Sequence, residues 1–424
     1  SIKLNFSTNS SSIVDEPEGK IDTQSERDAL RDSIMSFGRT TAYRHQFDVR
    51  YTVPINKFPL TDWVTLSLNY DATYDWNAGS RATVNDSINL GNVIQNTNNY
   101  KINTQLNLKS LYNKVPYFKK VNSSRKKKNS RNKRSDKFIG GSAETNKLDK
   151  EEEEEEEEER EFRGFEYLTK AILSVQNINF SYDEGNGTML PGFKPGVGPL
   201  GLSDVLNSKF APGWGFVFGQ QLDADDLVLF SEKDWITNDT LLNQQYTTQN
   251  TQRLNIRATL EPVKKLRIKL TAQRNATTNT SQTFRNTGTV DDIRFESLNR
   301  NETGSFTMSF LAINTAFRKM EINSSKTFDD FRAIRAQIAK RVAADKGQVN
   351  DDDIGYPIGY GPNSQEVLIP AFMAAYSGTN ASKQNLDKFP KIPLPNWTVK
   401  YDGLTDVKWI KKYFKNVAIS HGYS

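Results

Sequence analysis

Hydrophobic and polar residues alternate almost without interruption from residue 64 to residue 76, VTLSLNYDATYDW. Successive side chains of a β-strand point to opposite faces, so this stretch predicts a strand with one apolar and one polar face. The apolar face holds Val64, Leu66, Leu68, Tyr70, Ala72, Tyr74 and Trp76, and the polar face holds Thr65, Ser67, Asn69, Asp71, Thr73 and Asp75. The environment of the apolar face, a soluble core or lipid, decides the class of protein.

The same alternation recurs along the chain. It predicts further strands at 42–53, 100–108 and 168–182, where a change of phase between Val175 and Ile178 suggests a bulge. Residues 254–272 read as a hairpin whose turn contains Pro262, and another strand begins within 414–423. The sequence therefore predicts an all-β protein built from antiparallel strands.

Two features favour lipid over a soluble β-sandwich. The polar faces carry Asp, Arg, Lys and Asn throughout, whereas the apolar faces end in aromatic residues, as expected for a wet lumen and an aromatic girdle. Short connections at 57–62, 261–265 and 403–412 also alternate with long polar ones, as periplasmic turns and extracellular loops do in outer-membrane barrels. We therefore expect part of one transmembrane antiparallel β-barrel across 1–424, with extracellular loops containing short helices at 7–40, 77–98, 183–248 and 277–395.

The barrel hypothesis assigns roles to named residues. It places Val64, Leu66, Leu68 and Tyr70 against lipid. It places Asn69, Asp71 and Asp75 in the lumen, together with Asn103, Gln105 and Asn107. It assigns an aromatic girdle to Tyr51, Trp63, Tyr74 and Trp76. One difficulty is that 306–317, FTMSFLAINTAF, is an additional strand candidate that breaks the alternation of ascending and descending strands.

Composition narrows the alternatives. Mean hydropathy is −0.67 and no run of 18 apolar residues exists, which argues against a transmembrane helix but leaves barrel strands possible. The 424 residues contain no Cys, so neither disulfides nor thiol chemistry are expected. The N-terminus has no Met and no signal-peptide pattern, and both ends fall in strand-like sequence, so we expect an excised piece of a longer protein.

The charged residues are concentrated in one segment. Residues 119–137 contain ten Lys and Arg, and residues 151–159 are nine consecutive Glu. Blocks of like charge cannot bury a core, so 121–162 is predicted to be a disordered insertion on the periplasmic side. The basic run has no interleaved aromatic residues and is followed by its own acidic counterpart, so nucleic-acid binding is not expected.

The long loops contain local structure. TFDDFRAIRAQIAKRVA predicts a helix that begins with a capping box from Thr327 to Asp330, and IPAFMAAYSG predicts a second helix with Pro370 in its first turn. Residues 191–219 combine seven Gly and four Pro with five large aromatic residues. This loop is expected to pack as a cap on its own barrel; the alternative gives Trp214 and Phe216 to a gate or a partner.

The sequence does not support catalysis. The only histidines, His45 and His421, lie in predicted strands, and no Gly-rich phosphate loop precedes a helix. The Asp run at 351–353 lacks the spacing of an EF-hand. We therefore expect a protein that is not an enzyme and needs no cofactor or metal.

Several motifs resemble the SprA/Sov family of outer-membrane translocons of the type 9 secretion system in Bacteroidetes. The motifs are LPGFKPGVGPLG (190–201), APGWGFVFG (211–219), FDDFRAIRAQIAKR (328–341), VLIPAFMAAYSG (367–378) and PLPNWTVKYDGL (393–404), with DEPEGKIDT (15–23) and LYNKVPYFKK (111–120). Family members are several times longer, so the resemblance implies that this chain is one part of a barrel. The charged runs depart from the family pattern.

The resemblance implies a function and partners. It implies export of folded proteins across the bacterial outer membrane, used in gliding motility and protein secretion. It also implies contact with outer-membrane lipid, secreted cargo proteins, a shuttle protein at a lateral opening and a periplasmic plug protein. Two alternatives remain open: a TonB-dependent importer barrel, and a secreted β-rich adhesin or binding protein.

Overall fold

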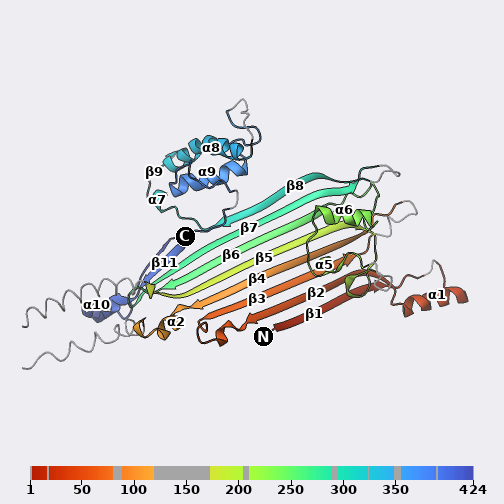
Figure 1. Cartoon of the computed structure of the whole chain (residues 1–424), viewed down its shortest axis with the longest axis horizontal. Helices are drawn as coiled ribbons and strands as arrows, with labels where there is room; N and C mark the ends of the chain where they lie inside the picture. Colours follow the sequence, from red (N-terminus) through yellow and green to blue (C-terminus); the bar gives the residue numbers. More distant parts are fainter. Residues whose placement is uncertain are drawn as a thin grey trace, which may run out of the picture. The chain divides into compact units, whose positions relative to one another are not determined.

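The computed structural model describes residues 2–16, 19–79, 88–118, 172–203, 210–288, 294–322, 324–347, 355–387 and 390–423. The predicted charged insertion, 121–162, lies outside these residues. The long strands of the described chain form one antiparallel sheet in the order β1-β2-β3-β4-β5-β6-β7-β11-β12, with β8 also paired to β7 (Figure 1). Its strands are β1 (Ile2–Ile13), β2 (Arg39–Val53), β3 (Val64–Asn77), β4 (Asn92–Asn107), β5 (Val175–Phe193), β6 (Tyr246–Leu260), β7 (Leu266–Asn286), β8 (Phe295–Met308), β11 (Asn396–Tyr401) and β12 (Ile419–Tyr423).

The antiparallel all-β character expected from the alternation is confirmed. Within the described residues, the sheet has β1 and β12 at its two edges and is not closed, so the barrel stays a prediction. No helix of the described part is long and apolar enough to cross a membrane. Several strands run further than expected: β1 occupies the start of the predicted loop 7–40, β5 continues to Phe193, and β7 continues to Asn286.

The strand candidate at 306–317 is wrong beyond its first three residues, because β8 ends at Met308 and Ile313–Ala316 form a short helix. The additional strand that breaks the alternation results from a divided strand position. β11 pairs with residues 266–271 of β7, so Asn396 lies opposite Thr271 and Tyr401 lies opposite Leu266. β8 pairs with the remainder of β7, and the Ser309 amide donates to the Gln273 carbonyl at 2.9 Å. β8 and β11 therefore pair with the same edge of β7, each over a different part of its length. Together they occupy the place of the one strand that would follow β7 if ascending and descending strands simply alternated.

Residues 309–395 are inserted between β8 and β11. This insertion contains α7 (Ile313–Ala316), the short hairpin β9 (Met320–Glu321) and β10 (Ser324–Ser325), α8 (Lys326–Asp345) and α9 (Gln365–Ser377). Ile338, Ala339, Val342, Val367 and Ala371 pack α8 against α9. The N-cap of α8 is Ser325, whose hydroxyl accepts from the Phe328 amide, so the predicted capping box begins two residues too late. α9 begins five residues before Pro370, which lies inside the helix, and ends at the left-handed Gly378.

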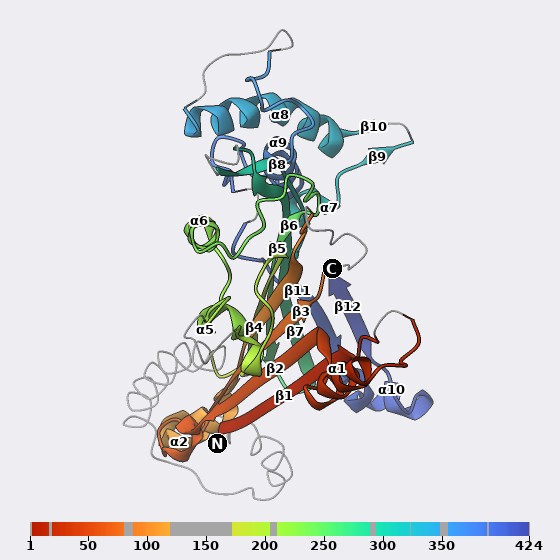
Figure 2. The same ribbon diagram turned by 90° about the vertical axis from the view of Figure 1, so that its right-hand side faces the viewer.

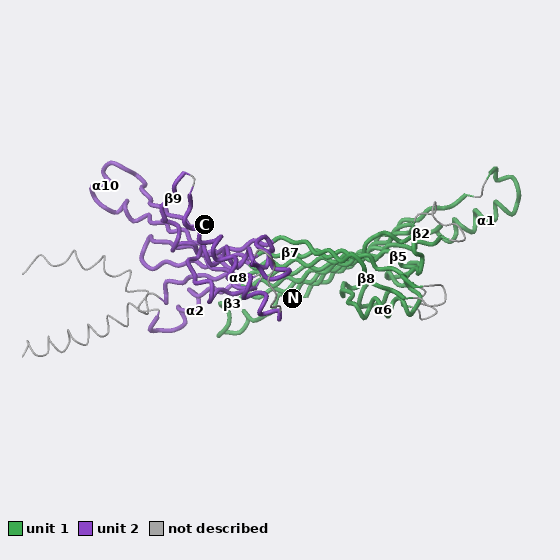
Figure 3. Tube along the Cα trace, turned by 90° about the horizontal axis from the view of Figure 1, so that it is seen from above, with its two compact units in different colours: residues 1–104, 180–254, 275–305 green, residues 105–179, 255–274, 306–424 purple. Residues whose placement is uncertain are grey.

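The chain divides into two compact units (Figure 3). Unit 1 comprises 1–104, 180–254 and 275–305, and unit 2 comprises 105–179, 255–274 and 306–424. The registers define two faces of the sheet, which we call face A and face B. On face A of unit 1, Leu68 lies opposite Tyr51, and Tyr74 lies opposite His45. Asn69, Asp71 and Asp75 alternate with these residues and belong to face B.

Candidate functional site

One end of face A in unit 1 is covered by residues 190–203 and 210–245, which we call the cap. The cap contains α5 (Trp214–Val217) and α6 (Ala224–Glu232), which lie on one side of β4 and β5 (Figure 2). Its apolar side chains join those of the strands in one core, which includes Tyr43, Tyr74, Trp76, Ile94, Leu190, Phe193, Leu202, Phe216, Val217, Phe230 and Tyr246. This is the largest apolar cluster of the described residues, and it fixes the loop on the sheet.

The predicted aromatic girdle is wrong for Tyr74 and Trp76. Tyr74 is 0% exposed and its ring lies 6.0 Å from that of Phe216, whereas the Trp76 indole donates to the Pro195 carbonyl at 3.1 Å. Both side chains lie beneath the cap and cannot contact lipid. The other two girdle residues differ: Tyr51 is half-buried on β2, and half-buried Trp63 lies before β3 and donates to the Leu60 carbonyl.

Five consecutive carbonyls of the cap accept hydrogen bonds from side chains of the sheet. The Asn96 amide donates to Phe216 and Gln220, and the Asn98 amide donates to Gly219. The donor to Val217 is His45 Nε2, at 2.6 Å, and the donor to Phe218 is the Tyr70 hydroxyl, at 2.5 Å. Because carbonyls at a helix C-terminus have no partner within the helix, these polar side chains replace water there.

Close backbone approach is possible because two residues are small. Gly219 has φ +97°, and a Cβ on it would lie 2.9 Å from the Ala72 Cβ, the Asn98 Cβ and the Tyr70 hydroxyl. Ala72 is itself fully buried. A larger side chain at either position would push the end of α5 away from the donors on the strands.

The cap also perturbs two titratable groups. Burial lowers the pKa of His45, whose ring is buried and donates from Nε2, and this effect outweighs the opposing hydrogen bond to Val217. Burial raises the pKa of Tyr246 to about 12, and its hydroxyl donates to the Leu222 carbonyl. Both residues are therefore neutral near pH 7.

The structure separates the two aromatic residues that the sequence paired as gate candidates. Phe216 is 3% exposed and belongs to the core beneath the cap, whereas Trp214 is 45% exposed. Trp214 stacks on Phe218 with ring centroids 6.0 Å apart, and Phe210 lies beside it. Packing of the cap on its own sheet accounts for Phe216, and only Trp214 remains available to a partner.

Beyond the cap, face A carries an apolar band in each unit. In unit 1 the band consists of the four predicted lipid-facing residues of β3 and of the residues of β1 and β2 that lie on the same face. Its members are Ile2, Leu4, Val49, Tyr51, Val53, Val64, Leu66, Leu68 and Tyr70. In unit 2 the band consists of three rows across β7, β11 and β12: Leu266, Tyr401 and Ile419; Ile268, Val399 and His421; Leu270, Trp397 and Tyr423. All are exposed or half-buried in the described chain.

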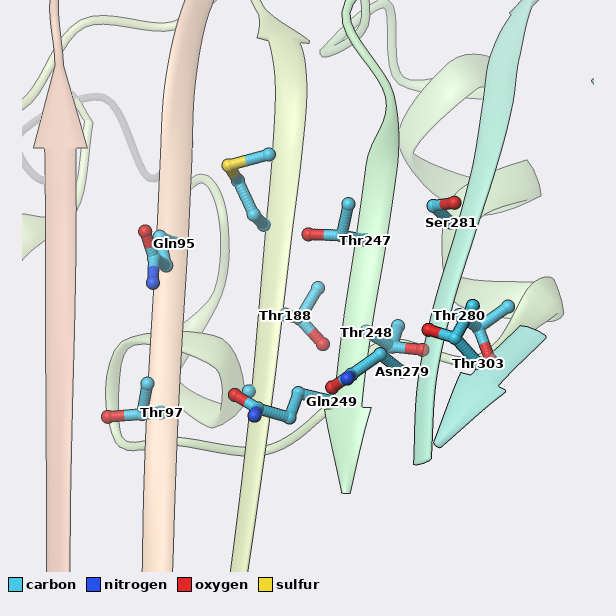
Figure 4. Close-up of a pocket in the computed structure, with 12 residues that line it drawn as sticks. Gln95, Thr97, Thr188, Thr247, Thr248, Gln249, Asn279, Thr280, Ser281 and Thr303 are labelled. Atoms are coloured by element: carbon cyan, nitrogen blue, oxygen red, sulfur yellow. The ribbon is translucent and has the colours of Figure 1, made fainter. Parts of the chain in front are cut away.

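Face B is polar and carries charge. Asp71 lies opposite Asp48 and accepts from the Asn99 amide, and Asp75 pairs with Arg44 at 3.6 Å. Further along this unit, a hollow of about 330 Å³ is lined by uncharged residues of β4 to β8 (Figure 4): Gln95, Thr97, Gly187, Thr188, Met189, Thr247, Thr248, Gln249, Asn279, Thr280, Ser281 and Thr303. The hollow offers hydrogen-bond donors and acceptors but no general acid, base or charged nucleophile.

Sequence reasoning missed the donors that hold the cap. The sequence places Asn96 and Asn98 in the expected loop 77–98, and it places His45 in a predicted strand with no hydrogen-bonding role. The available signal was the presence of polar side chains on the face that otherwise carries Tyr43, Phe47 and Ile94. Among the described residues, no group of His, Asp and Glu side chains is arranged to hold a metal ion.

Comparisons with known proteins do not assign a family. No family model matches the chain, and no curated protein matches it.

Proposed function

We propose that this chain forms part of the wall of an outer-membrane β-barrel that conducts proteins out of the cell, as its resemblance to the SprA/Sov family implies. The observation that carries the proposal is the difference between the two faces of one sheet. Face A has an apolar band in both units, whereas Asn69, Asp71 and Asp75 make face B polar and charged. A soluble sheet would cover such a band with a second layer, but among the described residues the cap covers only one end of face A in unit 1 and leaves the band beside it exposed or half-buried.

The band is shorter than a full membrane zone. It extends over five residues on β7, from Leu266 to Leu270, and over seven on β3, from Val64 to Tyr70. At about 3.4 Å per residue these lengths correspond to roughly 14–20 Å along the strands. The apolar zone of outer-membrane barrels is about 25 Å tall, so the band accounts for part of it. The proposal keeps the lipid-facing role of Val64, Leu66, Leu68 and Tyr70, with Tyr70 at the edge of the cap, where its hydroxyl donates to the Phe218 carbonyl.

The two faces would act differently in transport. A folded cargo protein needs a water-filled lumen, and face B supplies side chains that stay hydrated and offer no apolar patch to cargo. Because the cap shares face A with the band, it would cover the outer surface of the wall beyond the membrane. The lateral shuttle and the periplasmic plug are partners that the family resemblance implies.

Depletion of the native protein tests the proposal. We expect the protein to fractionate with detergent-extracted outer membrane and to co-purify with a plug or shuttle protein, and we expect its depletion to retain exported proteins in the periplasm. Loss of nutrient uptake with normal export would instead indicate a TonB-dependent importer. Recovery from the medium without detergent would indicate a secreted adhesin, and either result would contradict the proposal.

A further inference from the structure

The connection between β11 and β12 places a cluster of positive charge at one end of the strands. Residues 403–406 form the 3-10 helix η5, and α10 (Lys408–Tyr413) follows beyond the end of β11 (Figure 1). Lys408, Lys411, Lys412 and Lys415 are exposed, and residues 407–418 contain no Asp or Glu. This short segment therefore carries four positive charges and no negative charge of its own.

The same segment exposes three large aromatic side chains. Trp409 is 66% exposed, Tyr413 is 71% exposed and Phe414 is 56% exposed, whereas Ile410 is buried and anchors the helix. Exposing side chains of this size to water is unfavourable, by about 25 cal/mol per Å² of apolar surface. Aromatic residues mixed with Lys are typical of segments that lie in the headgroup region of a membrane.

The cluster is held close to the apolar band of unit 2. The Asp402 amide donates to the Lys265 carbonyl at 3.0 Å, and Lys265 Nζ pairs with Asp406 at 2.6 Å, so the connection is tied to the turn between β6 and β7. Tyr401 and Ile419, which flank the connection, lie opposite each other in the last row of the band. Exposed Val263 and Lys264 in the neighbouring turn extend the same mixture of apolar and basic side chains.

We propose that residues 407–415 dock on the surface of the adjoining membrane leaflet, with the Lys side chains on the phosphates of anionic phospholipids and the aromatic rings among the headgroups. The inference rests on the proposed function, because the band must face lipid for this connection to lie at the membrane surface. Each basic residue near an anionic surface adds to the attraction, and added salt screens it. The docked segment would fix the depth of the wall in the membrane.

These 424 residues contain no Cys, so a single cysteine introduced here can be labelled in vesicles once any Cys elsewhere in the longer protein has been replaced. A fluorophore on Asn416→Cys reports on the connection and leaves Trp409, Tyr413 and the lysines intact, whereas a fluorophore on Ile268→Cys reports on the band. Doxyl-labelled phospholipid and a water-soluble nitroxide are the two quenchers. The vesicles contain phosphatidylcholine with or without phosphatidylglycerol.

We expect phospholipid quenching at both positions, and at residue 416 this quenching should require phosphatidylglycerol and weaken in high salt. Neutralising Lys408, Lys412 and Lys415 with Gln should remove most of it. Neutralising the exposed Lys319, Lys326 and Lys346 of the insertion, an equal change of charge, should leave it intact. Phospholipid quenching at 268 together with aqueous quenching at 416 would overturn the docking alone. Protection of 416 from both quenchers would also overturn the docking, and it would indicate that a protein partner covers the connection. Absence of phospholipid quenching at 268 would overturn the proposed function as well.

Discussion

His45 Nε2 of β2 donates to the carbonyl of Val217, 172 residues later in the chain, at 2.6 Å. The bond joins the sheet to the end of α5, and Nδ1 of the same ring is buried without a hydrogen-bond partner in the described residues. Protonation would place a charge in an apolar environment beside Tyr74 and Phe218. The neutral imidazole is therefore the form that the cap binds.

This relationship predicts that the cap loosens in acid. Burial lowers the pKa of His45 in the capped state, so the released state binds the additional proton. The contribution of His45 to stability is complete above the ordinary histidine pKa of about 6.5 and is lost progressively as the pH falls below that value. Hydrogen-exchange protection of residues 214–222, corrected for the intrinsic effect of pH, should fall between about pH 7.5 and about pH 5. The same pH dependence in His45→Gln would contradict this origin.

The strands were predictable because their pattern is local. Alternation between Val64 and Trp76 is a property of consecutive residues, and β3 spans the same stretch. The burial of Tyr74 was not predictable in this way, because the residue that covers it, Phe216, lies far away in the sequence and belongs to a loop. Tyr74 and Leu68 occupy equivalent positions in the alternation, but the cap buries Tyr74 and leaves Leu68 exposed.

The division of one strand position between β8 and β11 has a similar cause. The sequence predicts a strand candidate at 306–317, but only residues 306–308 belong to β8, and Ile313–Ala316 form α7. That both strands pair with the same edge of β7 depends on contacts between distant segments, which periodicity does not encode. The donors Asn96 and Asn98 are hard to predict for a different reason. Asn is typical of loops, so the local composition favours a loop, although both residues lie on β4.

Adjacent residues of β3 provide a matched test of the two faces. If face A meets lipid as proposed, Arg in place of Leu68 buries a charge in hydrocarbon and should destabilise the assembled protein by about 2–4 kcal/mol at mid-membrane depth. Arg in place of Asn69 remains on face B in water and should cost far less. Urea unfolding of both variants in vesicles measures the difference, and equal destabilisation would show that the faces are assigned wrongly.

The close contact between Ala72 and Gly219 predicts overpacking when either residue is enlarged. Ala72→Leu adds volume where the Cα of Gly219 approaches the sheet, and Gly219→Val adds both volume and backbone strain at φ +97°. Each should destabilise the cap by about 1–3 kcal/mol. Thr65→Leu adds a Leu to the same strand at an exposed position and serves as the control. Proteolysis of the cap should accelerate in the first two variants, and unchanged rates would show that the contact is not tight.

The cap provides a last test that separates packing from recognition. Phe216→Ser removes a buried ring from the core and should destabilise the cap by about 3–5 kcal/mol, the usual cost of truncating a buried Phe. Trp214→Ser removes a ring that is half in solvent and stacks only on the edge of the cap, so assembly should persist. If Trp214 meets a partner, as an exposed aromatic residue on a fixed surface can, secretion should fall in this variant while the cap stays resistant to protease. Secretion and proteolysis measured together decide the matter: normal secretion by a stable Trp214→Ser protein would leave the aromatic residues of the cap with a packing role only.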